Sequence, residues 1–302
     1  MKEFSNKIKL ETQIIIHSMQ IWSAVKKRCN MIDNTYYQTI SVAEKSDEGI
    51  ALSNRDKQTI PWQAPQAEKL SRADLHIHST YSDGIPTIDQ ILKHTELHTD
   101  LDVIAITDHN VIDSSLRARD LWARGSYRFD FIVGEEISTN EGHLLALFIE
   151  KHIPSHLSIE HSIDLIHDQG GLAIVVHPLN PLFRISCQRD VLDRIYTNKD
   201  LWLDGIETWN AGLCGIYANR VVMRANRKCY GWSEVGNSDA HTLNAIGRAC
   251  TLFQGSTASD VRTAIQSGLS KPGGKLWHVN DFIVLAGHQM SKRHSSRRQP
   301  AA

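Results

Sequence analysis

The stretch Asp74-Leu75-His76-Ile77-His78-Ser79-Thr80-Tyr81-Ser82-Asp83-Gly84 sets the pattern for the rest of the chain. Leu75 and Ile77 alternate with His76 and His78, which predicts a strand with both imidazoles on one face. The stretch then ends in Ser-Asp-Gly, which is typical of a polar turn. Two histidines at a strand end, followed by a carboxylate on the next loop, are candidate metal ligands. A single His-x-His pair is weak evidence, because half-buried strands also carry histidines for packing or hydrogen bonding.

The composition indicates an ordered protein without an overall charge that would attract nucleic acid. The chain has 302 residues, 41% of them hydrophobic, and a net charge of −1. These values suit one large α/β domain or two small ones. Residues 291–302 carry four cationic side chains and no acid, so the remainder is mildly acidic. An acidic body is compatible with a site that holds cations, and it is also ordinary for a soluble protein.

Cysteine usage and hydropathy favour a cytoplasmic protein. The five cysteines are scattered and include no Cys-x-x-Cys motif, which predicts free thiols in a reducing compartment. The apolar stretches are shorter than a transmembrane helix. The run of isoleucines at 14–16 is interrupted too soon to form the core of a signal peptide. We therefore expect no membrane partner.

The chain divides into three predicted parts. Residues 1–70 form an extension of unknown role, with a candidate helix over 11–28 and an irregular polar segment over 43–68. Residues 71–275 form the main domain. Residues 276–302 form a flexible tail, whose basic end over 291–302 is expected to be disordered.

Strands alternate with helices throughout the main domain. Strands are predicted at 73–78, 102–107, 129–137, 141–149, 172–176, 203–208 and 232–236. Helices are predicted at 87–98, 112–124, 158–169, 187–198, 214–229 and 258–267, with Ser158 and Thr257 as N-caps. Continuous apolar runs such as 102–107 are typical of strands buried on both faces. The pattern predicts a parallel, barrel-like α/β domain.

Polar side chains gather where these strands end. In a β/α barrel the C-terminal strand ends converge on one mouth, so residues far apart in sequence could meet there. The candidates are His76, His78, Asp83, Asp108, His109, Glu136, His143, His177, Asp239 and His241. Each has a structural alternative, such as a helix-capping His109 or a hydrogen-bonded core His177. Burying all ten together is very costly without metal, whereas a metal makes it favourable. Ligands of this kind, without cysteine, suit Zn²⁺, Mn²⁺ or Fe²⁺.

As a set, these motifs resemble the polymerase and histidinol phosphatase (PHP) family of metal-dependent phosphoesterases. The motifs are, in order, His76-x-His78 with Ser82-Asp83-Gly84, Thr107-Asp108-His109-Asn110, Gly134-x-Glu136-x-Ser138, the isolated His143, His177-Pro178 and Ser238-Asp239-Ala240-His241. The resemblance covers about residues 72–270. It implies an α/β fold, a distorted (β/α)7 TIM-like barrel, with two or three divalent metal ions at its mouth.

The resemblance also implies three ligand sets. The first is His76, His78, Glu136 and Asp239; the second is Glu136, as a bridge, with His143 and His177; the third is Asp83, His109 and His241. Glu136 is preferred to Glu135 because it fits the Gly-x-Glu-x-Ser spacing. Asp74 and Asp108 are expected to orient ligands or to steady a loop.

Arginines are the expected phosphate clamps. Arg184, shortly after His177-Pro178, and Arg248, shortly after His241, are the best placed. An ordinary surface arginine or a structural ion pair is an equally open interpretation of both. Asn180 and Asn244 are weaker candidates.

The resemblance implies a hydrolase that acts on phosphoric ester bonds. A water that bridges two cations has its pKa lowered toward neutrality and becomes a hydroxide that attacks phosphorus in line. The Ser-Asp-Gly form of the first motif is similar to members that act on nucleoside 3′,5′-bisphosphates or trim the 5′ ends of short oligonucleotides. The alternatives are a histidinol-phosphatase-like phosphomonoesterase and a non-catalytic metal-binding module. The expected partner is a phosphorylated small molecule or short oligonucleotide, without stable binding of duplex DNA, and the oligomeric state is left open.

Overall fold

The computed structural model describes residues 70–181 and 186–296. The predicted extension over 1–70, with its candidate helix over 11–28, lies outside the described residues except for its last residue. Arg184 and the end of the basic tail, residues 297–302, also lie outside them. The fold therefore concerns the main domain and the segment that follows it.

Strands and helices alternate as predicted, within a few residues at their ends. The strands are β1 (Ser71–Asp74), β2 (Val103–Ile106), β3 (Asp130–Thr139), β4 (Gly142–Leu147), β5 (Leu172–Val175), β6 (Gly205–Asn210), β7 (Glu234–Asn237), β8 (Ala249–Phe253) and β9 (Lys271–Gly274). The helices are α2 (Ile88–His98), α3 (Asp113–Arg124), α4 (Ile159–Asp168), α5 (Arg189–Thr197), α6 (Gly215–Ala225), α7 (Ala258–Gln266) and α8 (Val279–Ser296), with the short turns η1 (Asn226–Tyr230) and η2 (Leu243–Ala245). Strands β8 and β9 and helix α8 are additions to the prediction.

The strands form one sheet in the order β7-β6-β5-β4-β3-β2-β1-β8-β9. Neighbours are parallel from β1 to β3 and from β5 to β7, but β4 runs antiparallel to both β3 and β5. The prediction of a parallel strand is therefore wrong at β4. Only Asn140 and Glu141 connect β3 to β4, and so short a connection permits a hairpin but no parallel crossover.

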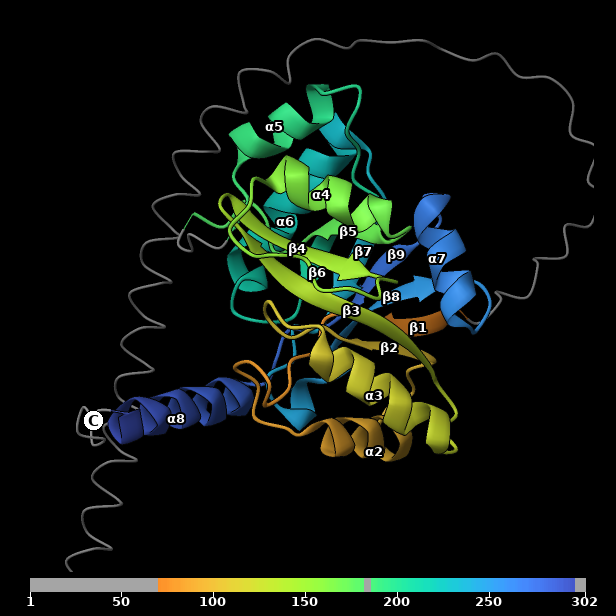
Figure 1. Ribbon diagram of the computed structural model, residues 1–302. Coiled ribbons are helices and arrows are strands. Elements are labelled where there is room, and N and C mark those ends of the chain that lie inside the picture. The colour runs from red at the N-terminus through yellow and green to blue at the C-terminus, as the bar shows by residue number, and fades with distance from the viewer. Residues whose placement is uncertain (1–69, 182–185, 297–302) are drawn as a thin grey trace, which may run out of the picture. The chain divides into compact units, whose positions relative to one another are not determined.

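The sheet closes on itself beyond the ends of β1 and β7. The His78 amide donates to the carbonyl of Ala240 over 2.9 Å, and the Ala240 amide donates to His76 over 3.1 Å. Further down the barrel, the Thr251 hydroxyl of β8 accepts from the Gly236 amide and donates to its carbonyl. The result is a nearly closed, distorted (β/α)7 barrel, with helices on its outer side (Figure 1).

Two hydrophobic cores lie on opposite faces of the sheet. On β2, Ile104 and Ile106 belong to the core that includes residues of α2 to α6, whereas Val103 and Ala105 belong to a second core. The second core contains strand residues together with Val261, Ala264 and Ile265 of α7. Thr257 caps α7 and Ser158 caps α4, as predicted. The second core fills the barrel below the mouth, and α7 packs against it.

The segment after β9 begins with buried residues. Trp277 and Asp281 are buried, and α8 continues to Ser296. Disorder of the basic end of the chain, residues 291–302, stays a prediction. The helix follows a buried anchor, which the sequence prediction treated as the start of a flexible tail.

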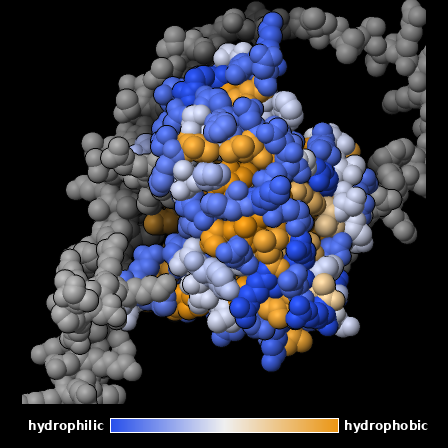
Figure 2. All heavy atoms as spheres, viewed as in Figure 1, coloured by the Kyte–Doolittle hydropathy of each residue, from blue (hydrophilic) through white to orange (hydrophobic). Residues whose placement is uncertain are grey.

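The outer surface mixes apolar and polar groups. On the face shown in Figure 2, apolar side chains form small groups among hydrophilic ones. Large exposed apolar residues such as Leu97, Tyr196 and Leu269 come from different elements, which is common on folded domains. No helix in the described part of the chain has the length and apolarity needed to cross a membrane. The four cysteines within it are free thiols.

Candidate metal centre

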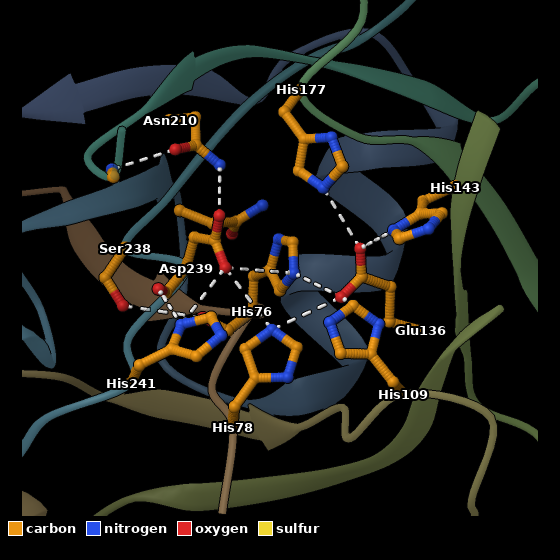
Figure 3. A network of polar contacts seen from close by, with 12 residues as sticks. His76, His78, His109, Glu136, His143, His177, Asn210, Ser238, Asp239 and His241 are labelled. Carbon is orange, nitrogen blue, oxygen red and sulfur yellow. Dashed lines mark hydrogen bonds and ion pairs between the residues drawn. The ribbon is translucent and has the colours of Figure 1, made fainter. Parts of the chain in front are cut away.

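The nine predicted ligands meet at the mouth of the barrel. They come from the segment after β1, the loop after β2, strands β3 and β4, and the segments after β5 and β7. His76 and His78 point to the same carboxylate, Glu136, as their alternation predicts. Figure 3 shows the histidines of this set around two carboxylates, those of Glu136 and Asp239.

Glu136 is the centre of the cluster. Its Oε1 lies 2.7 Å from Nδ1 of His143 and 3.0 Å from Nε2 of His177. Its Oε2 lies 3.1 to 3.2 Å from ring nitrogens of three more histidines: His76, His78 and His109. One buried carboxylate therefore contacts five imidazoles, as a bridging ligand between cations would.

Asp239 forms a second centre. Its Oδ1 lies 3.3 Å from Nε2 of His78 and 3.6 Å from Nε2 of His76. The same oxygen is 3.6 Å from Nδ1 of His241. The two histidines of the opening motif therefore lie between Glu136 and Asp239.

The cluster has a deep end and an open end. Glu136 and His76 are almost fully buried, whereas the side chains of Asp83 and His109 are 44% and 26% exposed. His241 connects the ends, with its Nε2 3.1 Å from Asp83 Oδ2. A substrate from solvent would reach the cluster at Asp83 and His109.

The two neighbouring glutamates of β3 face opposite ways. Glu135 accepts from the amide of Ile153 over 2.7 Å and lies 2.8 Å from Nδ1 of His152. These contacts are on the far side of the strand from Glu136. The geometry therefore agrees with the choice of Glu136 from the Gly-x-Glu-x-Ser spacing.

The backbone is strained at two of the candidate ligands. His177 has a φ of 33° and Asp239 a φ of 52°, in the left-handed region that favours glycine. Such strain concentrates at functional sites, because the surrounding fold must hold it. Both residues follow a strand end, where the turn directs their side chains into the mouth (Figure 3).

Asp108 and Asp74 hold backbone segments that carry ligands. Asp108 accepts from the Ser79 amide over 2.7 Å and from the hydroxyls of Ser79 and Ser82. These contacts steady the loop that leads to Asp83. Asp74 accepts from the amides of Ser238 and Gly247, next to Asp239 rather than beside His76. Burial raises the pKa of Asp74 to about 6.

Glu207 on β6 is a buried acid that the sequence prediction missed. Its Oε1 lies 3.2 Å from Nδ1 of His76, and its Oε2 accepts from the backbone amide of His177 over 2.9 Å. It stands inside an ordinary strand pattern, without a motif around it. The only available signal was an acidic residue in the interior of a predicted buried strand.

Electrostatics favour the ionised form of the carboxylates. Burial raises the pKa of Glu136, but His109, His76 and His143 outweigh it and hold the pKa well below its usual value. Burial also raises the pKa of Asp239, but the neighbouring histidines again outweigh burial and hold this pKa below its usual value.

Burial also lowers the pKa of His109, to about 4. Burial acts in the same direction on His76, His78 and His177, but the nearby carboxylates outweigh burial and raise the pKa of each. Because a cation binds neutral imidazole and ionised carboxylate, its binding would release protons from these histidines.

The cluster fits divalent cations. Four combinations bring ligand atoms within 4.8 Å of one another: His78, Asp83, His109 and His241; His76, Glu136 and His177; His76, His78 and Asp239; and His109, Glu136 and His143. Both ring nitrogens of His78 and Nδ1 of His109 are buried without a hydrogen-bond partner among the described residues. Unsatisfied buried nitrogens beside ionised carboxylates are what a bound cation would complete.

The predicted phosphate clamps are less defined. Arg248 donates from Nε and Nη2 to the carbonyl of Leu276, which ties it to the segment after β9. Asn180 is buried and donates to the carbonyl of Cys214, while Asn244 is exposed on η2. For Arg248 a phosphate-binding role stays a prediction, as it does for Arg184.

Comparison with known proteins agrees with this geometry. A family model described as PHP-associated matches residues 217–269. An uncharacterized protein of Methanocaldococcus jannaschii is 35% identical over 181 residues, which cover 54% of this chain and 99% of that protein. The 5′-3′ exoribonuclease Rnm of Salmonella typhimurium is 36% identical over 81 residues, 26% of this chain and 27% of that protein.

A solved structure shares the fold. It is a two-domain protein of Bacteroides vulgatus described as containing a PHP-like metal-dependent phosphoesterase, with a TM-score of 0.56 and 19% identity over 79% of this chain and 74% of that one. The fold and the matched family model agree with the order of motifs at the barrel mouth. The chain belongs to the PHP family of metal-dependent phosphoesterases, which are hydrolases acting on phosphoester bonds.

Proposed function

We propose that this protein hydrolyses phosphate esters of nucleotides or short oligonucleotides at the barrel mouth, with two or three divalent cations. The observation that carries the proposal is the contact of Glu136 with five histidines beside Asp239, in a cluster that opens to solvent at Asp83. Bound cations would lower the pKa of a shared water and neutralise phosphate oxygens. Zn²⁺, Mn²⁺ and Fe²⁺ all suit these ligands.

The residues of the chain supply the scaffold for this chemistry. Glu136 and Asp239 bring two ionised carboxylates within reach of the same imidazole, that of His78. Asp108 holds the turn that carries Asp83, so the open end has a fixed shape. Pre-organised charge of this kind stabilises the charge that develops on a phosphoryl group.

A nucleic-acid substrate is the finer part of the proposal. It is supported by the local match to the exoribonuclease Rnm, which covers about a quarter of each chain, and by the short Ser82-Asp83-Gly84 form of the first motif. The substrates we expect are nucleoside 3′,5′-bisphosphates and 5′-phosphorylated short oligonucleotides.

A panel of phosphate esters, assayed with Mn²⁺, tests the proposal. It contains adenosine 3′,5′-bisphosphate, 5′-phosphorylated RNA and DNA trimers, histidinol phosphate and p-nitrophenyl phosphate. We expect turnover that His76→Ala and Asp239→Ala both abolish, and that Asp204→Asn, away from the mouth, retains. Faster turnover of histidinol phosphate than of the nucleotides would contradict the nucleotide proposal and favour a histidinol-phosphatase-like phosphomonoesterase. Turnover that survives both mouth substitutions would mean that the reaction occurs elsewhere.

A further inference from the structure

Glu207 is a buried acid of the mouth that contacts candidate ligands without belonging to any of the four ligand combinations. It lies on β6 and contacts the ring of His76 and the backbone of His177. Four donors surround it, two on each oxygen. Oε1 faces His76 Nδ1 at 3.2 Å and accepts from Asn237 Nδ2 at 3.0 Å. Oε2 accepts from the His177 amide and from Asn210 Nδ2, both at 2.9 Å.

These contacts connect Glu207 to three candidate ligands. The first is the ring of His76, and the second is the backbone of His177, which is held at a positive φ. The third is Asp239, because Asn210 Nδ2 also donates to Asp239 Oδ2 over 3.2 Å (Figure 3). The Asn210 backbone is fixed in turn by two hydrogen bonds to the side chain of Asn219.

We infer that Glu207 is the positioning residue of the deep end of the metal centre. Since its carboxylate faces Nδ1 of His76, the proton of that ring is held on Nδ1. The lone pair of Nε2 is then directed toward Glu136 and Asp239, at 3.1 and 3.6 Å. A carboxylate behind a ligating histidine fixes the tautomer and orientation of the ring and increases its basicity. This inference rests on the proposed metal centre.

Glutamine at this position would preserve the shape but not the pattern of acceptors. Whichever way the amide is oriented, its NH₂ group faces one pair of donors. Either His76 and Asn237 or the His177 amide and Asn210 then lose their acceptor. Substitutions of such partners lower metal affinity by about 10- to 100-fold.

The experiment measures binding of Mn²⁺ alone, without substrate. Full-length wild type and Glu207→Gln are stripped with chelator, and affinity and equivalents per chain are measured by competition and elemental analysis. We expect Glu207→Gln to bind Mn²⁺ about 10- to 100-fold more weakly at the deep end. The site that includes Asp83 and His241 should retain its wild-type affinity for Mn²⁺, because Glu207 contacts neither residue.

Asp204→Asn is the matched control. Asp204 also contacts a histidine, His167, over 2.9 Å and accepts from the backbone amide of Ala173. It stands away from the candidate ligands, so its substitution should lower stability without changing Mn²⁺ affinity. Equal effects of the two substitutions on thermal stability of the metal-free protein, with unchanged Mn²⁺ binding in both, would reduce Glu207 to a structural residue.

A milder variant covers the case in which Glu207→Gln does not fold. Asn237→Ser removes one donor to Glu207 Oε1, and it should weaken the same deep-end binding by a smaller factor. Unchanged Mn²⁺ affinity in this variant, where Glu207→Gln is unfolded, would overturn the inference. If wild type itself binds no Mn²⁺, Zn²⁺ or Fe²⁺, the metal centre fails and the positioning role fails with it. If wild type binds and neither Glu207→Gln nor Asn237→Ser weakens binding, only the positioning role fails.

Discussion

The two sides of strand β3 place identical side chains in different chemical settings. Glu136 faces the mouth and contacts five imidazoles, whereas Glu135 faces outward and holds a loop through Ile153 and His152. Both carboxylates are buried. Their pKa values shift in opposite directions: burial raises that of Glu135, while the histidines lower that of Glu136 in spite of burial. The difference shows that the density of neighbouring imidazoles, rather than burial, distinguishes the candidate metal ligand Glu136 from Glu135.

Glu136→Gln should have the largest effect of the substitutions on β3. It removes the charge that five histidines share, so we expect loss of at least one metal equivalent and a fall in phosphoesterase kcat/KM of at least about a hundredfold. Elemental analysis and steady-state kinetics on the same preparation measure both. If the variant retains both metal and activity, Glu136 is not the ligand that bridges the cations.

Asp83→Asn separates the open end from the deep end. Asp83 contacts His241 over 3.1 Å, and it lies 3.8 Å from His109. We expect the cation at these residues to bind at least about tenfold more weakly, while the deep-end cations remain. Mn²⁺ titration followed by elemental analysis distinguishes the two ends. A simultaneous loss of all cations would mean that the ends form one cooperative site.

Glu135→Gln tests the other side of the strand. It leaves a neutral amide against Ile153 and His152, and we expect a loss of about 1–3 kcal/mol in the free energy of unfolding. Metal content should stay at the wild-type value. Chemical denaturation and elemental analysis check the two expectations. Loss of metal from this variant would contradict the assignment of the two faces of β3.

Sequence patterns predicted that candidate ligands meet where each belongs to a motif at the end of a predicted strand. His76, His78, His109 and Glu136 follow this rule, because strand ends in a barrel converge whatever the lengths of the helices between them. The antiparallel direction of β4 was missed, although the predicted strands leave only residues 138–140 between them, which are too few for a parallel crossover. The alternation of strands and helices favours a parallel strand here, and only the length of the connection opposes it.

Other features depend on tertiary contacts that no local pattern records. Glu207 has its role only because β6 lies behind His76, and its own neighbours in sequence resemble any buried strand. The same is true of Trp277, which falls within a segment predicted as a flexible tail. It is buried because β9 returns the chain to the mouth of the barrel.

Trp277→Phe should have the smallest effect on the mouth, and it tests how the segment after β9 supports the centre. The indole Nε1 donates to the carbonyl of Ser238 over 2.7 Å, directly before Asp239, and the ring lies 5.9 Å from that of His241. Phenylalanine keeps the apolar contact with Phe282 but loses the hydrogen bond. We expect a loss of about 1 kcal/mol in unfolding free energy, with a decrease in Mn²⁺ affinity smaller than that of Asp83→Asn.

Trp122→Phe provides the matched control for this hydrogen bond. The indole of Trp122 on α3 also donates to a backbone carbonyl over 2.7 Å, that of Phe129, and this contact is away from the candidate ligands. The two variants should therefore lose similar stability, and only Trp277→Phe should lose Mn²⁺ affinity. If both bind Mn²⁺ like wild type, Trp277 anchors α8 without supporting the centre. The strained φ of Asp239 would then be held by other contacts, among them those of Asp74 with the Ser238 amide and of Asn210 with Asp239 Oδ2.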